Sequence, residues 1–207
     1  EELGLPESGF VFCSFNNNYK ITPDVFDVWM RILKKVKDSV LWLQETNSVA
    51  NHNLKQEAIK RGVDSSRIIF AVRIKIDEHL ARFKKADLFL DTLPYGASVT
   101  ASDALWTGVP VLTRLSDSWA GRVAASLLNA IGLPELITYT KKDYEDLAVK
   151  LATDTNQLKE IKKRLENNRL EKPLFDTKLF TKNIESAYII MQERYLSNLP
   201  VENIELK

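Results

Sequence analysis

The sequence is poor in cysteine and glycine, and each shortage excludes a class of protein. Its single cysteine, Cys13, can form neither an internal disulfide nor a cysteine-rich metal site. The chain has only seven glycines, and neither G-x-G-x-x-G nor the P-loop lysine motif occurs. These absences argue against a dinucleotide-dependent oxidoreductase and against a P-loop nucleotide triphosphatase. Because Cys13 lies within the apolar run 10–15, we interpret it as a buried, inert thiol.

Positive and negative charges nearly cancel, with 29 Lys and Arg residues against 28 Asp and Glu residues. This balance gives no overall field that would attract nucleic acid or an acidic membrane, so we expect neither partner. No run of about 18 apolar residues is present, and the first residues lack the basic and apolar regions of a signal peptide. We therefore expect a cytoplasmic protein. Asp, Glu and His residues form no cluster suited to a metal ion, and we expect none.

Short apolar runs alternate with helical patterns along the chain, which predicts an α/β fold with a Rossmann-like parallel sheet and helices on both faces. The predicted strands are residues 10–14, 40–44, 68–72, 88–91, 109–113 and 135–138. Helices are predicted after Thr22 and at residues 51–61, 78–85, 99–106, 119–131, 141–153, 156–167 and 177–196. We predict one domain, residues 1–198, followed by a tail at 199–207.

The first and last predicted helices have the clearest patterns. The first begins at Thr22-Pro23, a typical N-cap followed by proline at the first helical position. The last one, 177–196, has an apolar stripe that we interpret as a face packed against the core. This stripe consists of Phe180, Ile184, Ala187, Tyr188, Met191 and Tyr195.

Residues 86–113 are the most informative segment because they combine a strand, a polar loop, a helix start and a second strand. A helix that begins just past the carboxyl end of a buried strand directs its free N–H groups into the crevice where nucleotide phosphates commonly bind. Asp103, about one turn inside that helix, could accept hydrogen bonds from ribose hydroxyls. However, Thr100 and Asp103 also fit the S/T-x-x-D pattern of a capping box, so both interpretations stay open at this point.

Further stretches in the same order resemble one known family. They are FNNNYKI (15–21), SVLWL (39–43), RIIF (67–70), DEH with Arg82 (77–82), RVAAS (122–126), DYEDLA (143–148) and PLFDT (173–177). Together with residues 86–113, they resemble the carboxyl-terminal lobe of the O-linked N-acetylglucosamine transferases, in a bacterial-type form. These enzymes are peptide O-glycosyltransferases with the two-lobed GT-B fold, in which this lobe binds the sugar donor.

The resemblance assigns roles to residues that carry little information on their own. Lys20 alone would be read as a solvated charge, but the resemblance implies that it binds the donor diphosphate and neutralises charge as the nucleotide leaves. Asn17 stands where the family commonly has glutamine, near the phosphates. His79 and Arg82 share one face of a predicted helix and could simply cap or pack. The resemblance implies instead that both contact the uracil ring.

In the loop after the fourth strand, the resemblance implies that Ser98, Val99, Thr100 and Asp103 hold the rest of the donor. Here the chain departs from the family, whose usual Asn-Gly-His-Thr-Thr is replaced by Gly-Ala-Ser-Val-Thr at 96–100. Backbone N–H donors survive this change, so we expect a diphosphate site with altered affinity or donor preference. The family's uracil-contacting lysine falls on Ile76, and Lys75 lies one residue out of register.

The function that the resemblance implies is the UDP-sugar-binding half of an inverting glycosyltransferase that moves N-acetylglucosamine from UDP to Ser or Thr of a protein. The expected partners are the UDP-sugar donor, the acceptor protein, and an amino-terminal catalytic lobe and TPR region that these 207 residues do not contain. No further cofactor is expected, and the active site should be incomplete in this chain alone. The alternative is a nucleotide-binding or interaction module whose donor site has decayed and which has no transferase activity.

Overall fold

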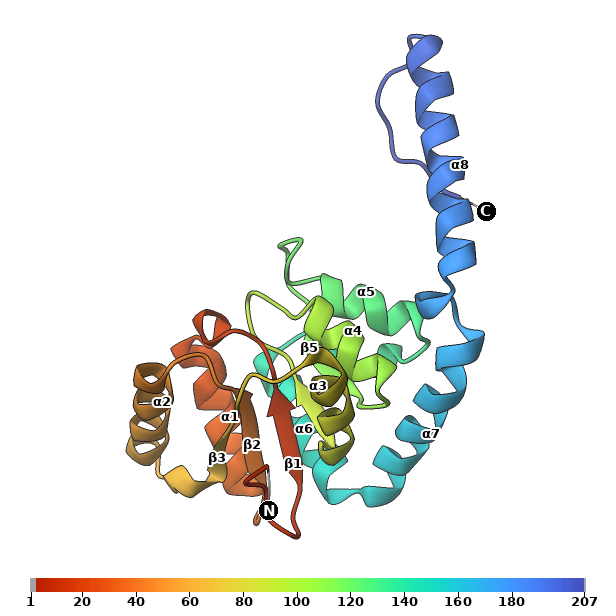
Figure 1. The fold of residues 1–207 in the computed structure, drawn as a ribbon. Coiled ribbons are helices and arrows are strands. Elements are labelled where there is room, and N and C mark those ends of the chain that lie inside the picture. The colour runs from red at the N-terminus through yellow and green to blue at the C-terminus, as the bar shows by residue number, and fades with distance from the viewer. Residues whose placement is uncertain (1–2, 207) are drawn as a thin grey trace.

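The computed structural model describes residues 3–206, and a six-stranded parallel sheet forms its centre (Figure 1). The strands follow the order β3-β2-β1-β4-β5-β6, and every neighbouring pair is parallel. They are β1 (Val11–Ser14), β2 (Val40–Gln44), β3 (Ile68–Ala71), β4 (Leu88–Leu90), β5 (Val111–Arg114) and β6 (Ile137–Thr138). The predicted fold class and all six predicted strands are confirmed, with ends that shift by up to two residues.

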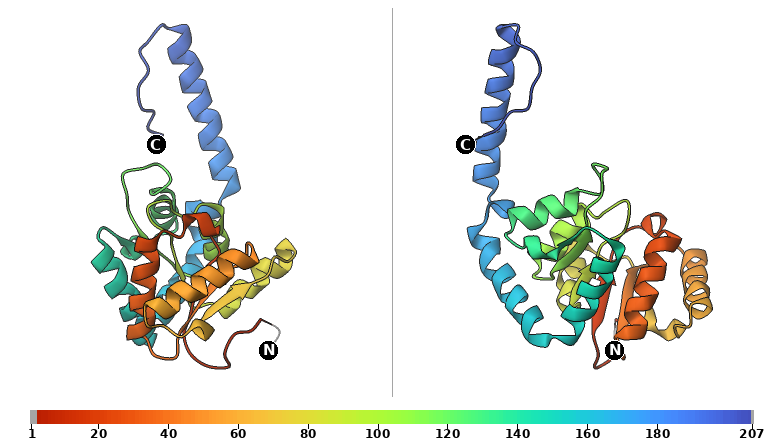
Figure 2. Two further views of the ribbon diagram at one scale, coloured as in Figure 1. Left: turned by 90° about the vertical axis from the view of Figure 1, so that its left-hand side faces the viewer. Right: turned by 180° about the vertical axis from the view of Figure 1, so that it is seen from behind.

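Helices cover both faces of this sheet. The helices of the described residues are α1 (Pro23–Lys35), α2 (Ser48–Lys60), α3 (Ile76–Arg82), α4 (Val99–Trp106), α5 (Val123–Ala130), α6 (Lys141–Thr153), α7 (Thr155–Glu171) and α8 (Thr177–Leu196), of which α8 does not cover the sheet. Short 3-10 turns lie at Asn18–Lys20, Ser65–Arg67, Phe83–Lys85, Pro134–Leu136 and Pro173–Phe175. In Figure 1, α3 and α4 lie in front of the sheet, and the reverse view in Figure 2 shows α1 and α6 on the other face.

The core explains why the central strands read as continuous apolar runs. All residues of β1 and β4 are buried, because each strand has helices on both sides. Cys13 of β1 is fully buried, and burial raises the pKa of its thiol far above the usual range, which agrees with an inert side chain. On α1, Trp29 donates to the hydroxyl of Tyr144 at 3.2 Å, and that hydroxyl donates to the backbone oxygen of Asp91 at 2.9 Å. The helices on one face are thereby tied to the end of β4.

Several helix predictions need correction. The helix predicted at 51–61 begins already at Ser48, and the one predicted at 156–167 continues to Glu171. The helix predicted at 119–131 begins only at Val123, because Gly121 N–H bonds back to Ser118 in a turn that replaces the first helical residues. The stripe on α8 was predicted to be a core face, but α8 has no buried residue and projects away from the sheet (Figures 1 and 2). Tyr188 and Tyr195 are 63% and 81% exposed. The stripe is real, but nothing in residues 3–206 covers it.

The topology fixes where a ligand site can form. After β3 the chain crosses back, so that β4 pairs with β1 on the side opposite β2. The loops that leave β1 and β4 therefore turn away in opposite directions and leave a crevice at the carboxyl ends of these two strands. Open parallel sheets bind their ligands at such a switch point.

Candidate nucleotide-diphosphate site

The β4–α4 loop, residues 91–98, forms one wall of the crevice at the switch point and is held at successive backbone oxygens. Three of these oxygens accept from side-chain hydroxyls: Leu93 O from Thr22 (3.0 Å), Pro94 O from Ser116 (3.5 Å) and Tyr95 O from Thr92 (2.8 Å). The fourth, Gly96 O, accepts from the Lys20 ammonium group (2.9 Å). A loop held at this many points keeps one shape before any ligand arrives. Such preorganisation lowers the entropic cost of binding.

Two glycines allow this loop to approach its neighbours closely. A Cβ atom at Gly96 would lie 3.0 Å from both the Ala120 oxygen and the Asp91 Oδ2 atom. A Cβ atom at Gly121, in the loop between β5 and α5, would lie 1.7 Å from Ser116 Oγ and 2.8 Å from Pro94 O. Glycine is required at Gly121 by contact, since these distances leave no room for a side chain.

The start of α4 tests the capping-box interpretation of Thr100 and Asp103. The N-cap residue is Ser98, whose side chain makes no capping hydrogen bond, and Thr100 already lies inside the helix. The hydroxyl of Thr100 donates instead to Asn16 Oδ1 at 2.6 Å. The capping-box interpretation is therefore wrong, and the first N–H groups of α4 have no side-chain cap. Such groups, with the positive end of the helix dipole, attract anions.

Asp103 lies one turn further along α4 and is half-buried. Burial raises the pKa of its carboxyl group above the usual range. Within residues 3–206, no hydrogen-bond donor is recorded for this carboxylate, which keeps its acceptor capacity open. That is the property a ribose-binding carboxylate needs.

Lys20 reaches the same loop from the other side of the switch point. It ends the 3-10 turn that follows β1, and its ammonium group donates to Gly96 O at 2.9 Å. The ammonium nitrogen also lies 4.4 Å from the centre of the Tyr95 ring. An ammonium group has three N–H donors, so the bond to Gly96 leaves donors for an anion next to the start of α4.

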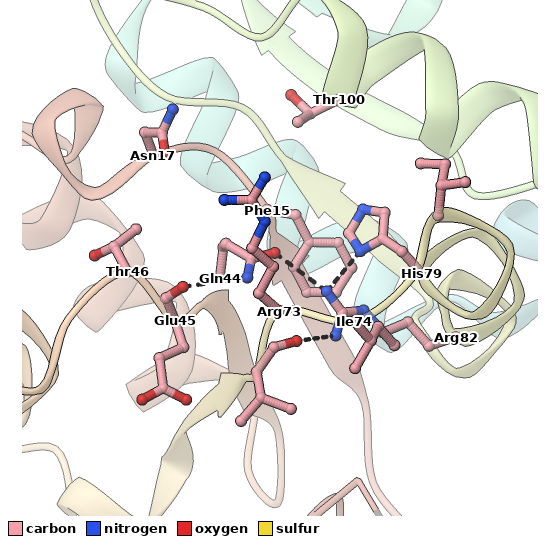
Figure 3. A pocket seen from close by; sticks show the side chains of 12 residues that line it. Phe15, Asn17, Gln44, Glu45, Thr46, Arg73, Ile74, His79, Arg82 and Thr100 are labelled. Atoms are coloured by element: carbon pink, nitrogen blue, oxygen red, sulfur yellow. Dashed lines mark hydrogen bonds between the residues drawn. The ribbon is translucent and has the colours of Figure 1, made fainter.

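A pocket of about 920 Å³ opens beside this loop (Figure 3). Its lining residues are Phe15, Asn17, Gln44, Glu45, Thr46, Val72, Arg73, Ile74, Ile76, His79, Arg82 and Thr100. Four predicted site residues, Asn17, His79, Arg82 and Thr100, meet here. Lys20, Ser98, Val99 and Asp103 lie outside the lining, on or beside the β4–α4 loop. The structure thus separates a pocket from an adjoining anion-attracting loop.

His79 and Arg82 act as a pair within the pocket wall. Arg82 Nη2 lies 2.5 Å from His79 Nδ1, and because arginine can only donate, Nδ1 is the acceptor. Burial, followed by the Arg82 charge, lowers the pKa of His79 to about 4. The ring is therefore neutral at pH 7, with its proton on Nε2, where it can be donated to a ligand. Figure 3 shows the ring on the opposite side of the pocket from Asn17.

Arg82 itself is buried, and the protein engages its Nη1 and Nη2 groups, whereas its buried Nε–H has no hydrogen-bond partner within residues 3–206. It donates to Val72 O at 2.7 Å and to Gln44 at 3.1 Å, and its guanidinium lies 5.0 Å from the Phe15 ring centre. With this geometry Arg82 is suited to orienting His79 and is less suited to reaching a ligand in the pocket. Ile76, on which the family's uracil-contacting lysine falls, lines the pocket, whereas Lys75 precedes α3 and does not line it.

Sequence reasoning missed three residues of this region. Asp91 and Asn16 are buried at the ends of β4 and β1, and Arg73 is an exposed cation in the pocket wall. A signal for Asp91 existed, because a carboxylate at the end of an otherwise apolar strand is unusual. Within residues 3–206, no group of three or more His, Cys, Asp or Glu side chains could hold a metal ion. In the same range no helix has both the length and the apolar character to cross a membrane.

Comparison with known proteins gives a consistent result. The profile of Glycosyl transferase family 41 matches residues 1–184. The UDP-N-acetylglucosamine–peptide N-acetylglucosaminyltransferase of Caenorhabditis elegans is 38% identical over 200 residues, covering 97% of this chain and 17% of the relative. A probable enzyme of the same name from Arabidopsis thaliana is also 38% identical, over 95% of this chain and 20% of its own length. The chain thus spans about a fifth of the curated relatives it matches.

Solved structures agree on the fold. An O-GlcNAc transferase mutant from Thermobaculum terrenum superposes with a TM-score of 0.83 at 34% identity, over 87% of this chain and 35% of that one. A UDP complex of HepE from Anabaena superposes with a TM-score of 0.64 at 16% identity, over 90% of this chain and 50% of that one. The second likeness shows only that the lobe architecture is shared.

Proposed function

We propose that this chain, which belongs to glycosyl transferase family 41, binds the UDP-sugar donor of a transferase that moves N-acetylglucosamine to Ser or Thr of proteins. It is a glycosyltransferase domain of the O-GlcNAc transferase family, matched over most of its length by the family profile. The observation that carries the proposal is the pairing of a pocket with an uncapped helix start and a lysine at one switch point. A nucleoside diphosphate needs the pocket for its base and the helix start with the lysine for its diphosphate.

In this proposal the two parts bind different ends of the nucleotide. The pocket takes the uracil, with His79 donating from Nε2 to a carbonyl oxygen of the base. The amides of Ser98, Val99 and Thr100 and the ammonium of Lys20 take the diphosphate, with Asn17 at the edge between them. Asp103 accepts from the ribose. Because these donors are already fixed, they stabilise the charge that develops on the leaving diphosphate without further reorganisation.

The acceptor side of the reaction is proposed to lie on the part of the protein that this chain does not span. His52 is exposed on α2, and His79 is bound to Arg82, so neither histidine is placed to act as a general base beside Lys20. The apolar stripe of α8 is uncovered and suits a contact with the amino-terminal lobe. We therefore propose that this chain binds UDP but transfers no sugar alone.

Several finer predictions also stay proposals. The bacterial type is supported by the likeness to the Thermobaculum terrenum protein, whereas the curated relatives named above come from an animal and a plant. We keep the domain limit at residue 198 as a proposal; it lies two residues past the end of α8 at Leu196. The TPR region and the cytoplasmic location rest on the family resemblance and on the sequence.

A donor screen tests the proposed function. The full-length protein is assayed for sugar transfer to peptides across UDP and GDP sugars, and the chain alone is tested for UDP binding by calorimetry. We expect UDP binding by the chain and transfer from UDP-N-acetylglucosamine by the full-length protein. UDP binding without any transfer by the full-length protein would favour the alternative, a nucleotide-binding module. Absence of UDP binding by both would refute the donor site.

A further inference from the structure

The carboxylate of Asp91 lies beneath the β4–α4 loop and has no role in the function proposed above. It is fully buried at the end of β4. Its Oδ1 atom accepts from Thr92 N–H at 2.7 Å and from Ala97 N–H at 2.6 Å, and its Oδ2 atom accepts from the Thr113 hydroxyl at 2.7 Å. These donors favour the charged form, while burial opposes it and raises the pKa to about 6. Asp91 is therefore ionised at neutral pH.

The bond to Ala97 matters because of the peptide group to which it belongs. The Gly96–Ala97 peptide is held at both ends: its N–H donates to Asp91 and its C=O accepts from Lys20. A flipped peptide would turn the Gly96 oxygen toward the buried carboxylate, where two oxygens repel each other. Asp91 therefore selects one of the two orientations of this peptide. The other orientation would also remove the acceptor that holds Lys20.

Asn16 extends the same network across the switch point. It is buried at the end of β1, and its amide nitrogen donates to Thr92 at 2.9 Å and approaches Asp91 Oδ1 at 3.4 Å. Its amide oxygen accepts from Thr100 on α4 at 2.6 Å. The ends of β1 and β4 and the start of α4 are thus joined by side chains that are largely out of water, where hydrogen bonds are strong.

The charged groups that face Asp91 are few. Lys20, from the turn after β1, attracts the carboxylate through space, and the Tyr144 hydroxyl from α6 bonds to the backbone oxygen of the same residue. Burial raises the pKa of Tyr144 well above the usual range, so this hydroxyl stays neutral. Lys20 is accordingly the cation that offsets the Asp91 charge.

We propose that Asp91 is the positioning residue of the diphosphate site. It fixes the Gly96–Ala97 peptide so that the following amides, those of Ser98 to Thr100, face the ligand and Gly96 O holds Lys20. Asp91 itself does not touch the ligand. The inference rests on the proposed UDP-binding function and adds to it the residue that sets the geometry of the phosphate half.

The test compares UDP with uridine, because uridine uses the pocket but has no diphosphate. Affinities of both are measured at pH 7.5 for the wild-type chain and for Asp91→Ala, Asp91→Asn and Thr113→Val. The ratio of UDP affinity to uridine affinity reports on the phosphate half alone. A loss of overall stability does not change this ratio as long as the protein stays folded.

We expect Asp91→Ala to lower the ratio about tenfold or more, the value of one hydrogen bond to a charged group. Asp91→Asn should restore it to within about threefold of wild type, because the amide oxygen still accepts from Ala97 N–H. Thr113→Val, which removes only the Oδ2 contact, is the matched control and should keep the wild-type ratio. A folded Asp91→Ala protein with the wild-type ratio would overturn the proposal, and so would an Asp91→Asn protein as weak as Asp91→Ala.

Two further outcomes stay informative. If wild type does not bind UDP, the proposed function fails, and this inference with it. If Asp91→Ala does not fold, amide hydrogen exchange of Ala97 is measured in Asp91→Asn. Protection of this amide together with near-normal UDP affinity supports the proposal. Loss of that protection with unchanged UDP affinity overturns it.

Discussion

Replacing Lys20 with methionine removes the ammonium group, which lies over the Tyr95 ring, while keeping most of the aliphatic stem. In the structure this ammonium holds Gly96 O at 2.9 Å and lies 4.4 Å from the Tyr95 ring centre. The variant therefore loses two contacts to the protein, with Gly96 O and with the Tyr95 ring, and, in the proposed site, one contact to the diphosphate. The loss of protein contacts and the loss of the ligand contact can be measured separately.

The loss of ligand affinity follows from the value of a hydrogen bond to a charged group, about 1.5 to 3 kcal/mol. Since about 1.4 kcal/mol corresponds to a factor of ten, UDP should bind roughly 10- to 150-fold more weakly. Uridine affinity should be unchanged, because Lys20 does not line the pocket. The unfolding free energy should fall by about 1 to 3 kcal/mol, since the buried Gly96 oxygen loses its partner.

Calorimetry with UDP and with uridine, together with urea unfolding, measures all three quantities. Lys141→Met is the matched control, because Lys141 is an exposed lysine paired with Asp24 at 2.5 Å. Because water screens this exposed pair, its loss should change stability little and leave UDP affinity intact. A Lys20→Met protein that is folded and binds UDP as tightly as wild type would refute the assignment of Lys20 to the diphosphate.

Three other predictions use different parts of the structure. Asp103→Asn should weaken UDP binding with little change in the thermal midpoint, and unchanged affinity would remove this residue from the ribose site. His79 has a depressed pKa of about 4 in the folded chain. Its stabilising effect should thus be present above the unfolded pKa of about 6.5 and be lost as the pH falls toward 4. Urea unfolding at several pH values should accordingly show wild type losing stability relative to His79→Gln over that range; parallel curves would contradict the neutral ring. Removing residues 177–207 should leave the thermal midpoint and UDP affinity nearly unchanged, because α8 buries no residue against the sheet; loss of the folded state would show that α8 is part of the core.

The fold was largely predictable because buried parallel strands must be apolar on both faces. For this reason β1 and β4 occur in the sequence as continuous apolar runs, and such runs predicted the ends of every strand to within two residues. The helix predicted to start at Trp119 failed because residues 118–121 form a turn. Gly121 N–H donates to Ser118 within this turn, and Gly96 N–H of the β4–α4 loop donates to Ala120 O at 3.2 Å. On α8 the periodicity shows an apolar face, but periodicity cannot say which body covers that face.

The site was only partly predictable. The resemblance grouped Asn17, His79 and Lys20, and the structure places all three at the carboxyl edge of the sheet, while their roles in donor binding stay predictions. The capping-box alternative could not be excluded from sequence, because it depended on whether α4 starts before or after Thr100. The role of Asp91 was not predicted, because its partner Thr113 lies on another strand and its partner Ala97 lies in a loop whose shape the sequence does not give. Such contacts exist only once the strands are side by side.

The two glycines in the crevice loops limit how the donor preference of this chain could be re-engineered. Transplanting the usual family residues into positions 96–100 would put an asparagine at Gly96, whose Cβ would lie 3.0 Å from the Ala120 oxygen. The engineered protein would therefore also need the β5–α5 loop, residues 115–122, from the same family member. The two loops have to be exchanged together. Evolution faces the same restriction, so a change of sugar in relatives of this chain should be accompanied by paired substitutions in both loops.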